Sequence, residues 1–440
     1  MANSGNSASS RDVAYVLHPY TNLELHQSAG PQIITRGEGI YVEDEEGKKY
    51  IEGMAGLWCA SLGFGEERLV KAAERQMRTL PFYHVFASKS HLPVIDLAEK
   101  LITMAPLPMS KIFFANSGSE ATDSVVKLVW YYNNALGRPK KKKIISRQRA
   151  YHGVTVAAAS MTGLPFNHRD FDLPIDRIIH ADCPHHYRYG LPGESEQAFS
   201  KRLAVNLEKL IEDEGPDTVA AFIAEPVMGA GGVIVPPKGY FEAIQPILKK
   251  YDILFIADEV ICGFGRTGNM FATETYNLQP DMITMAKALS AAYTPISAVM
   301  LNKQVADVVY ENSGKIGSFG HGFTYSAHPM SAAVALETLC IYEERDIVSH
   351  VRSLMGYFQD GLQALAEHPL VGEARGVGLL GGIELVEDKD RKKNFAPSAS
   401  VGASVAARCL EHGKGNLEDL RWLPGYLRAP APCEPAIKLR

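Results

Sequence analysis

The chain has 440 residues, of which 46% are hydrophobic and 22% charged, and its formal net charge is -5. This length suffices for more than one domain and a large core, and the composition is ordinary for a globular protein. The mildly acidic balance gives no electrostatic basis for binding nucleic acid or an anionic membrane, so we expect small molecules as partners.

Six cysteines are scattered along the chain without a CxxC pair: Cys59, Cys183, Cys262, Cys340, Cys409 and Cys433. This pattern argues against a disulfide framework and against a zinc site, so we expect no metal and a reducing compartment. No apolar stretch reaches the length of a membrane span. The first ten residues lack the apolar core of a secretory signal, which favours the cytoplasm. A mitochondrial presequence is the weaker alternative, since Arg11 is the single basic residue nearby.

In chain order, residues 1–12 are expected to be disordered, 33–51 to form a short β-meander and 69–77 to be helical. Between residues 111 and 290, apolar runs alternate with amphipathic segments, which is typical of βαβ units in a mostly parallel sheet. The predicted strands are 111–115, 143–146, 219–224, 253–257 and 282–286. The predicted helices are 120–136, 196–212, 240–250 and 330–344.

Segment 182–193, with paired histidines and prolines, is expected to be a long surface loop. Helices at 348–367 and 401–412 and a strand at 378–385 indicate a smaller α+β domain near the carboxyl end. We therefore predict an α/β fold with a large domain over 71–330. The segments 13–70 and 331–413 would form a small domain from both chain ends, and 414–440 is an atypical tail.

Two apolar runs that indicate strands buried on both faces end in chemically useful residues, Asp258 and Lys287. Ligands bind at the carboxyl ends of strands in open α/β sheets. A carboxylate for a pyridinium nitrogen and a lysine for a Schiff base are what pyridoxal phosphate (PLP) requires. Taken singly, an acid that caps a turn and a solvated lysine are the more common interpretations.

The glycines after Asp258 could be mistaken for a dinucleotide-binding loop. Gly263, Gly265 and Gly268 have the G-x-G-x-x-G spacing. They follow an acid, however, and lack a matching βαβ unit with a later ribose-binding acid. We therefore reject a nicotinamide cofactor.

A phosphate site is predicted at Asn116–Glu120, which follows a strand and opens a helix. Ser117 and Glu120 have the spacing of a capping box. The backbone N–H groups of Gly118 and Ser119, with the helix dipole, would bind a phosphate dianion, although plain helix capping is the alternative. Thr324 is a second candidate for binding phosphate.

Two further residues are candidates for the site because of their position in the chain. Tyr151 could stack on a pyridine ring, the alternative being an ordinary half-buried aromatic side chain. Glu225 ends the strand 219–224 before Pro226, where a surface acid before a turn is the alternative.

Together these motifs resemble those of the class III, PLP-dependent (fold type I) aminotransferases, and within them the ω-amino acid or amine:pyruvate transaminases. The resemblance covers roughly residues 13–412. Its motifs occur in the expected order: His18-Pro19-Tyr20, Gly56-Leu57-Trp58-Cys59, Asn116–Glu120, Tyr151-His152-Gly153, Glu225-Pro226, Asp258–Gly268 and Ala286-Lys287-Ala288-Leu289.

The resemblance implies the roles of the cofactor site. Lys287 would be the Schiff-base lysine and proton shuttle, and Asp258 would pair with the ring nitrogen. Val260 and Tyr151 would pack on the two ring faces. The other residues expected to contact the cofactor are Ser117, Gly118, Ser119, His152, Glu225 and Thr324. Thr324 would come from a neighbouring subunit, so a homodimer or a dimer of dimers with shared active sites is expected.

The resemblance also implies a substrate pocket lined by Tyr20, Trp58, Phe86 and Tyr151. Glu225 would pair with a mobile arginine that binds a substrate carboxylate. Arg421 stands near the expected position of this arginine, but its flanks do not match the family pattern, and neither does the Pro/Ala-rich remainder. Our hypothesis is that the reading frame of the tail is altered.

The expected activity is transfer of an amino group from an amine or ω-amino acid to a keto acid, pyruvate being the expected acceptor. Two alternatives stay open on the sequence: another class III PLP reaction, such as an aminomutase or a decarboxylating transaminase, or a PLP-binding protein inactivated by its tail.

Overall fold

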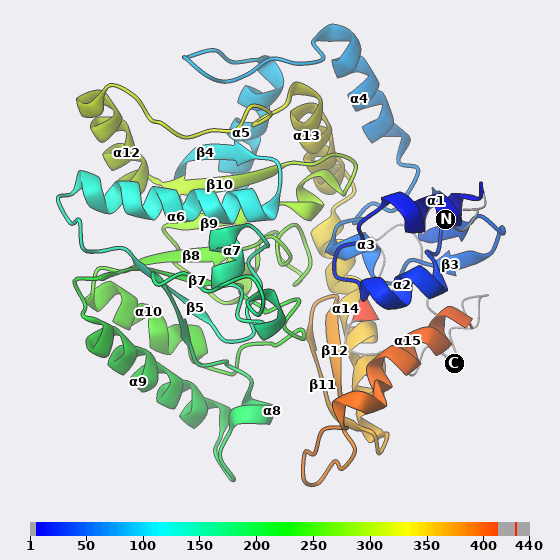
Figure 1. Ribbon diagram of the computed structural model, residues 1–440. Coiled ribbons are helices and arrows are strands. Elements are labelled where there is room, and N and C mark those ends of the chain that lie inside the picture. Colours follow the sequence, from blue (N-terminus) through cyan, green and yellow to red (C-terminus); the bar gives the residue numbers. More distant parts are fainter. Residues whose placement is uncertain (1–5, 412–426, 429–440) are drawn as a thin grey trace.

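We describe residues 6–411, 427 and 428 of a computed structural model of the chain (Figure 1). At its centre is a seven-stranded sheet with the order β4-β10-β9-β8-β7-β5-β6. The pairs from β9 through β8, β7 and β5 to β6 are parallel, whereas β10 is antiparallel to β4 and β9. The predicted α/β fold with a mostly parallel sheet is therefore confirmed. The strands are β4 (Met109–Ala115), β5 (Lys143–Arg147), β6 (Ile178–Ala181), β7 (Val219–Ala224), β8 (Leu254–Asp258), β9 (Met282–Met285) and β10 (Ser297–Asn302).

Helices cover both faces of this sheet, because its central strands are apolar on both sides. In β8, Phe255 and Ala257 belong to one buried cluster, and Leu254 and Ile256 belong to another. The first cluster includes side chains of α5 (Leu92–Met104), α9 (Glu196–Glu214), α10 (Tyr240–Lys250) and α13 (Pro329–Glu344). The second includes side chains of α6 (Gly118–Ala135), α7 (Val156–Met161) and α12 (Lys303–Ile316). This alternation is the expected period of two for a strand between two helical layers.

Segments from both ends of the chain lie on one side of the central sheet, where the blue and orange ribbons meet in Figure 1. The amino-terminal part has a three-stranded antiparallel sheet, and the Lys48 ammonium donates a hydrogen bond to the Leu410 carbonyl at 3.0 Å. This contact fits a small domain built from both ends, although the domain boundaries stay a prediction. The amino-terminal elements are α1 (Ala8–Tyr15), α2 (Leu23–Ala29), β1 (Ile34–Glu38), β2 (Tyr41–Asp44), β3 (Lys49–Ile51), α3 (Ala55–Trp58) and α4 (Glu67–Thr79). The carboxyl-terminal elements are α14 (Ile347–Ala364), β11 (Val371–Val377), β12 (Leu380–Leu385), α15 (Val401–Glu411) and β13 (Leu427–Arg428).

The structure departs from two sequence predictions. Disorder is expected over residues 1–12, but residues 8–12 belong to α1, which the Ser7 side chain caps by accepting from the Ser10 N–H at 3.1 Å; residues 1–5 lie outside the described part. Segment 182–193 is not simply a surface loop. It contains the one-turn helix α8 (His186–Tyr189), and Cys183 and His185 are buried, with His185 at 2.8 Å from the Glu373 carboxylate.

Candidate active site

A cavity of about 480 Å³ opens at the carboxyl ends of the parallel strands. The segments that follow β4, β5, β7, β8 and β9 all contribute to its wall. Nine residues singled out in the sequence line it: Ser117, Gly118, Ser119, Tyr151, His152, Glu225, Asp258, Val260 and Lys287. Residues up to 170 positions apart meet here because each follows a strand of the same sheet edge.

Asp258 is buried and held at both carboxylate oxygens. Its Oδ1 accepts from the Val260 N–H at 3.1 Å and from the Thr284 hydroxyl at 3.0 Å. Its Oδ2 lies 2.6 Å from His152 Nδ1, which donates since a carboxylate can only accept. Such a carboxylate is fixed in direction and can stabilise a positive charge in the cavity.

His152 therefore forms a hydrogen bond with Asp258 in this structure, and the sequence did not predict this contact. Its side chain is fully buried, and the Nε2 atom has no hydrogen-bond partner among the described residues. His152 also lines the cavity.

Lys287 follows β9 after a single residue and begins a 3-10 turn, Lys287–Ser290. Its φ angle is +54°, in the left-handed region that costs a residue with a side chain about 1 kcal/mol or more. Asp258 pairs with Thr284 in the parallel register of β8 and β9, so Asp258 and Lys287 lie on neighbouring strand ends. A half-buried amine and a buried carboxylate thus share one cavity.

The amino end of α6 forms another part of the wall. The Ser117 side chain caps the helix by accepting from the Glu120 N–H at 3.2 Å. Glu120 reaches back to the N–H and side-chain amide of Asn116, both at 2.8 Å, so the reciprocal bond falls one residue earlier than the capping box predicts. The N–H groups of the first turn have no partner within a helix, and they make this end suitable for an anion.

Gly153 lets a second segment approach this helix end closely. Its φ angle is +130°, and an added Cβ would lie 2.5 Å from the Ser119 hydroxyl oxygen. The Val154 N–H donates to that same oxygen at 3.0 Å. The backbone of residues 153 and 154 therefore positions Ser119.

We expect Gly153→Ala to weaken cofactor binding by roughly tenfold or more, because the methyl group would displace Ser119 at the anion site and one lost hydrogen bond to a charged group costs about 1.5–3 kcal/mol. Fluorescence titration of the cofactor-free protein would measure this change. Gly137→Ala is a matched control, since Gly137 also has a positive φ angle (+72°) but open space around its Cβ position. An equal loss of affinity in both variants would contradict this role.

The Tyr151 backbone and the Glu225 side chain are hydrogen-bonded to each other in the cavity wall. The Glu225 carboxylate is buried and accepts from the Tyr151 N–H at 3.0 Å and the Gly229 N–H at 2.9 Å. Burial raises the pKa of Glu225, and the nearby Asp258 carboxylate adds to this shift. Burial and then a hydrogen bond with Tyr20 raise the pKa of Tyr151, so its phenol is neutral.

Other predicted residues lie outside this cavity. Tyr20 is 65% exposed and accepts from the Asn167 amide at 2.7 Å, and Trp58 packs in a buried cluster with Val227 and Ile261. Phe86 and Thr324 are exposed, and Arg421 lies outside the described residues.

The structure also adds residues that the sequence interpretation missed. Thr284 holds Asp258, and Cys59 and Thr294 line the cavity. The Thr294 hydroxyl is buried and without a hydrogen-bond partner among the described residues. Cys59 could have been predicted from the sequence, because it directly follows Trp58. Thr284 and Thr294 could not, because threonine is common and neither residue belongs to a motif with a recognisable spacing.

Comparison with known proteins identifies the family. The family profile described as Aminotransferase class-III matches residues 25–413, so the match ends where the tail departs from the family pattern. The chain belongs to the class III aminotransferases. It is an enzyme that transfers an amino group to a keto acid, and this family is PLP-dependent.

Curated relatives of high similarity are plant transaminases. Gamma-aminobutyrate transaminase 1, mitochondrial, of Oryza sativa subsp. japonica is 55% identical over 399 residues, covering 90% of this chain and 77% of the relative. Gamma aminobutyrate transaminase 3, chloroplastic, of Solanum lycopersicum is 56% identical over 399 residues, with the same coverage. These names do not support the cytoplasmic prediction, which stays untested.

Solved structures agree in fold. A thermostable omega transaminase 6-fold mutant from Pseudomonas jessenii has a TM-score of 0.92 and 58% identity, covering 92% of this chain and 90% of that one. The Pseudomonas jessenii omega transaminase in complex with PMP has a TM-score of 0.91, 58% identity and the same coverage. Within the described part of this chain, no helix has the length and apolar character needed to span a membrane.

Proposed function

We propose that this aminotransferase binds PLP in the cavity at the sheet edge and takes its amino group from an amine or ω-amino acid, with pyruvate as the acceptor. The observation that carries the proposal is the meeting of Lys287, Asp258 and the α6 amino end in one cavity. A lysine, a buried acid and an anion site are the three groups that this cofactor needs.

The residues that line the cavity are suited to binding PLP. The close approach of Gly153 to Ser119 leaves no room for a side chain, so this backbone segment lies directly beside the helix end. The donor set at this end consists of the N–H groups of Gly118 and Ser119 with the hydroxyls of Ser117 and Ser119. The flat ring of Tyr151 and the branched side chain of Val260 supply the apolar surfaces between which an aromatic ring would pack.

When bound, PLP supplies an electron sink for the pair of electrons released at the substrate carbon. The Asp258 carboxylate favours the protonated ring nitrogen, because an opposite charge stabilises the charged form. The Lys287 amine would hold the cofactor before substrate arrives, and it would then take the proton from the substrate carbon and deliver it to the cofactor carbon that receives the amino group. His152 and Thr284 keep the two carboxylate oxygens in place.

The donor class is tested by a half-reaction. Single turnovers of the purified holoprotein with a panel of amines and ω-amino acids should convert the cofactor to its amine form, which is followed by absorbance. Addition of pyruvate should restore the starting spectrum and release alanine. Conversion by α-amino acids alone would contradict the proposed donors, and a spectrum restored by other keto acids but not by pyruvate would contradict the acceptor.

We further propose that two chains associate and share their active sites. Phe86 and Thr324 are exposed, and an added Cβ on Gly322 would lie 3.0 Å from the Phe86 ring. Phe82 and Tyr325 are also exposed and pack edge to face, with ring centroids 5.6 Å apart. This exposed aromatic surface supports an interface at which Thr324 and Phe86 reach the cavity of the partner chain.

A further inference from the structure

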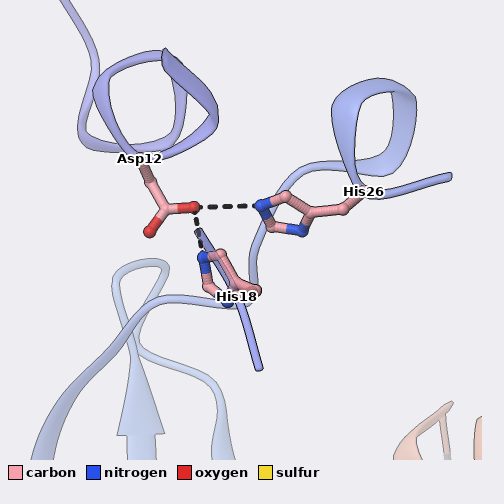
Figure 2. Close-up of side chains that lie close together, drawn as sticks. All are labelled: Asp12, His18 and His26. Carbon is pink, nitrogen blue, oxygen red and sulfur yellow. Dashed lines mark hydrogen bonds and ion pairs between the residues drawn. The ribbon is translucent and has the colours of Figure 1, made fainter. Parts of the chain in front are cut away.

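Three side chains with metal-binding atoms converge at the amino end of the chain, outside the active-site cavity (Figure 2). Asp12 comes from α1, His26 from α2, and His18 from the segment between the two helices. The Nε2 atoms of His18 and His26 lie 2.8 and 3.1 Å from the same oxygen, Asp12 Oδ1. Both rings are therefore directed at one point.

The spacing of these atoms is close to that of a metal coordination sphere. Bonds of about 2.1 Å to a tetrahedral zinc ion separate its ligand atoms by about 3.4 Å. The three ligand atoms all lie within 4.8 Å of one another, so small side-chain rotations suffice to place an ion between them. Two imidazoles and one carboxylate suit Zn²⁺ and related divalent transition metals.

The surroundings fix this geometry and leave one side open. The side chain of His26 is 9% exposed, whereas those of Asp12 and His18 are 22% and 28% exposed. Gly30, which ends α2, lies against α1 so closely that an added Cβ would be 2.9 Å from the Ser9 hydroxyl oxygen. The two helices are thus packed together, and water can complete the coordination from the open side.

We propose that Asp12, His18 and His26 form a site for a divalent transition metal, with Zn²⁺ as the preferred ion. The bound ion would link α1 to α2. This departs from the expectation of no metal, which rested on the absence of paired cysteines. The three ligands here are six and eight residues apart, a spacing without a common motif.

The site is linked to the active-site cavity through the chain. His18 stands two residues before Tyr20. The Tyr20 hydroxyl accepts a hydrogen bond from the Asn167 side-chain amide, and the Tyr20 ring packs edge to face on Phe166 with ring centroids 6.2 Å apart. Burial and then the nearby Tyr20 hydroxyl raise the pKa of the cavity residue Tyr151, so the two side chains lie close together. A bound ion would restrict the 12–26 segment and so keep Tyr20 in place beside the cavity.

The test uses the holoenzyme, prepared without a polyhistidine tag, treated with a chelator and dialysed. Titration with ZnCl₂ in a calorimeter should show about one tight site per chain, and zinc should raise the unfolding temperature. The variants Asp12→Asn and His26→Gln can still hydrogen-bond at this position, but their amides are poor ligands. Each should weaken zinc binding by roughly tenfold or more and abolish the zinc-dependent rise in unfolding temperature.

His368→Gln, a substitution in the distant turn before β11, is the matched control and should bind zinc as the parent does. Equal zinc affinity in the parent and in both site variants would overturn the proposal, because the ion would then bind elsewhere. Absence of tight binding to the parent would overturn it as well, and would leave a purely hydrogen-bonded cluster.

Discussion

Lys287→Ala is expected to abolish the absorbance band of lysine-bound cofactor and to lower the rate of amino transfer by about 10⁴-fold or more, since both a covalent anchor and an acid–base group are lost. The purified variant, mixed with cofactor, is scanned between 300 and 500 nm and assayed with an amine and pyruvate. An unchanged band would show that another lysine anchors the cofactor.

The large effect follows from how the chain holds this lysine. It stands one residue after β9 in a left-handed conformation (φ +54°), so the sheet edge rather than a flexible loop sets its position in the cavity. A strained backbone angle at a cavity-lining residue is a common feature of functional sites.

Lys287→Arg is the matched control for charge. Arginine keeps a cation at the position, but its guanidinium neither forms the covalent link nor gives up a proton near neutral pH. We expect the same loss of activity as for alanine, with less loss of stability. Substantial activity in the arginine variant would mean that only the positive charge matters.

Asp258→Asn is expected to reduce kcat/KM by about 10³-fold, or ~4 kcal/mol of transition-state stabilisation. The amide preserves the size of the side chain and an acceptor for Val260 and Thr284, but it removes the negative charge that favours a protonated ring nitrogen. Steady-state kinetics and the position of the cofactor absorbance band measure the two consequences.

Thr284→Val is the control that separates charge from position. It removes one of the hydrogen bonds to Asp258, at 3.0 Å, and leaves the carboxylate. The expected loss is about tenfold, in keeping with ~1.5 kcal/mol for one hydrogen bond to a charged group. If Thr284→Val were as damaging as Asp258→Asn, alignment of the carboxylate rather than its charge would dominate.

The central strands and the residues at their ends could be predicted because two simple signals coincide. Val219–Ala224 is apolar throughout and forms β7 as predicted, and the run before Asp258 forms β8. Since parallel strands end at the same edge, Asp258, Lys287 and Glu225 could be expected to meet, and they do line one cavity.

Contacts that depend on tertiary packing could not be predicted in this way. β10 was missed as a strand, and its antiparallel direction next to β9 is set by the connection after Lys287 and not by its composition. The bond between His152 and Asp258 joins residues 106 positions apart, and neither residue carries a local signal for it. The helix α1 was missed because its cap, Ser7, lies in a Ser- and Asn-rich stretch that resembles a disordered terminus.

Lys287 is expected to hold the cofactor in the cavity beside Asp258. The most direct measurement is borohydride reduction of the holoprotein, which makes the link between lysine and cofactor permanent, followed by proteolysis and mass spectrometry of the peptides. We expect the cofactor mass on the peptide that contains Lys287. Its presence on a peptide with a different lysine, or on no peptide, would rule out Lys287 as the anchor of the cofactor.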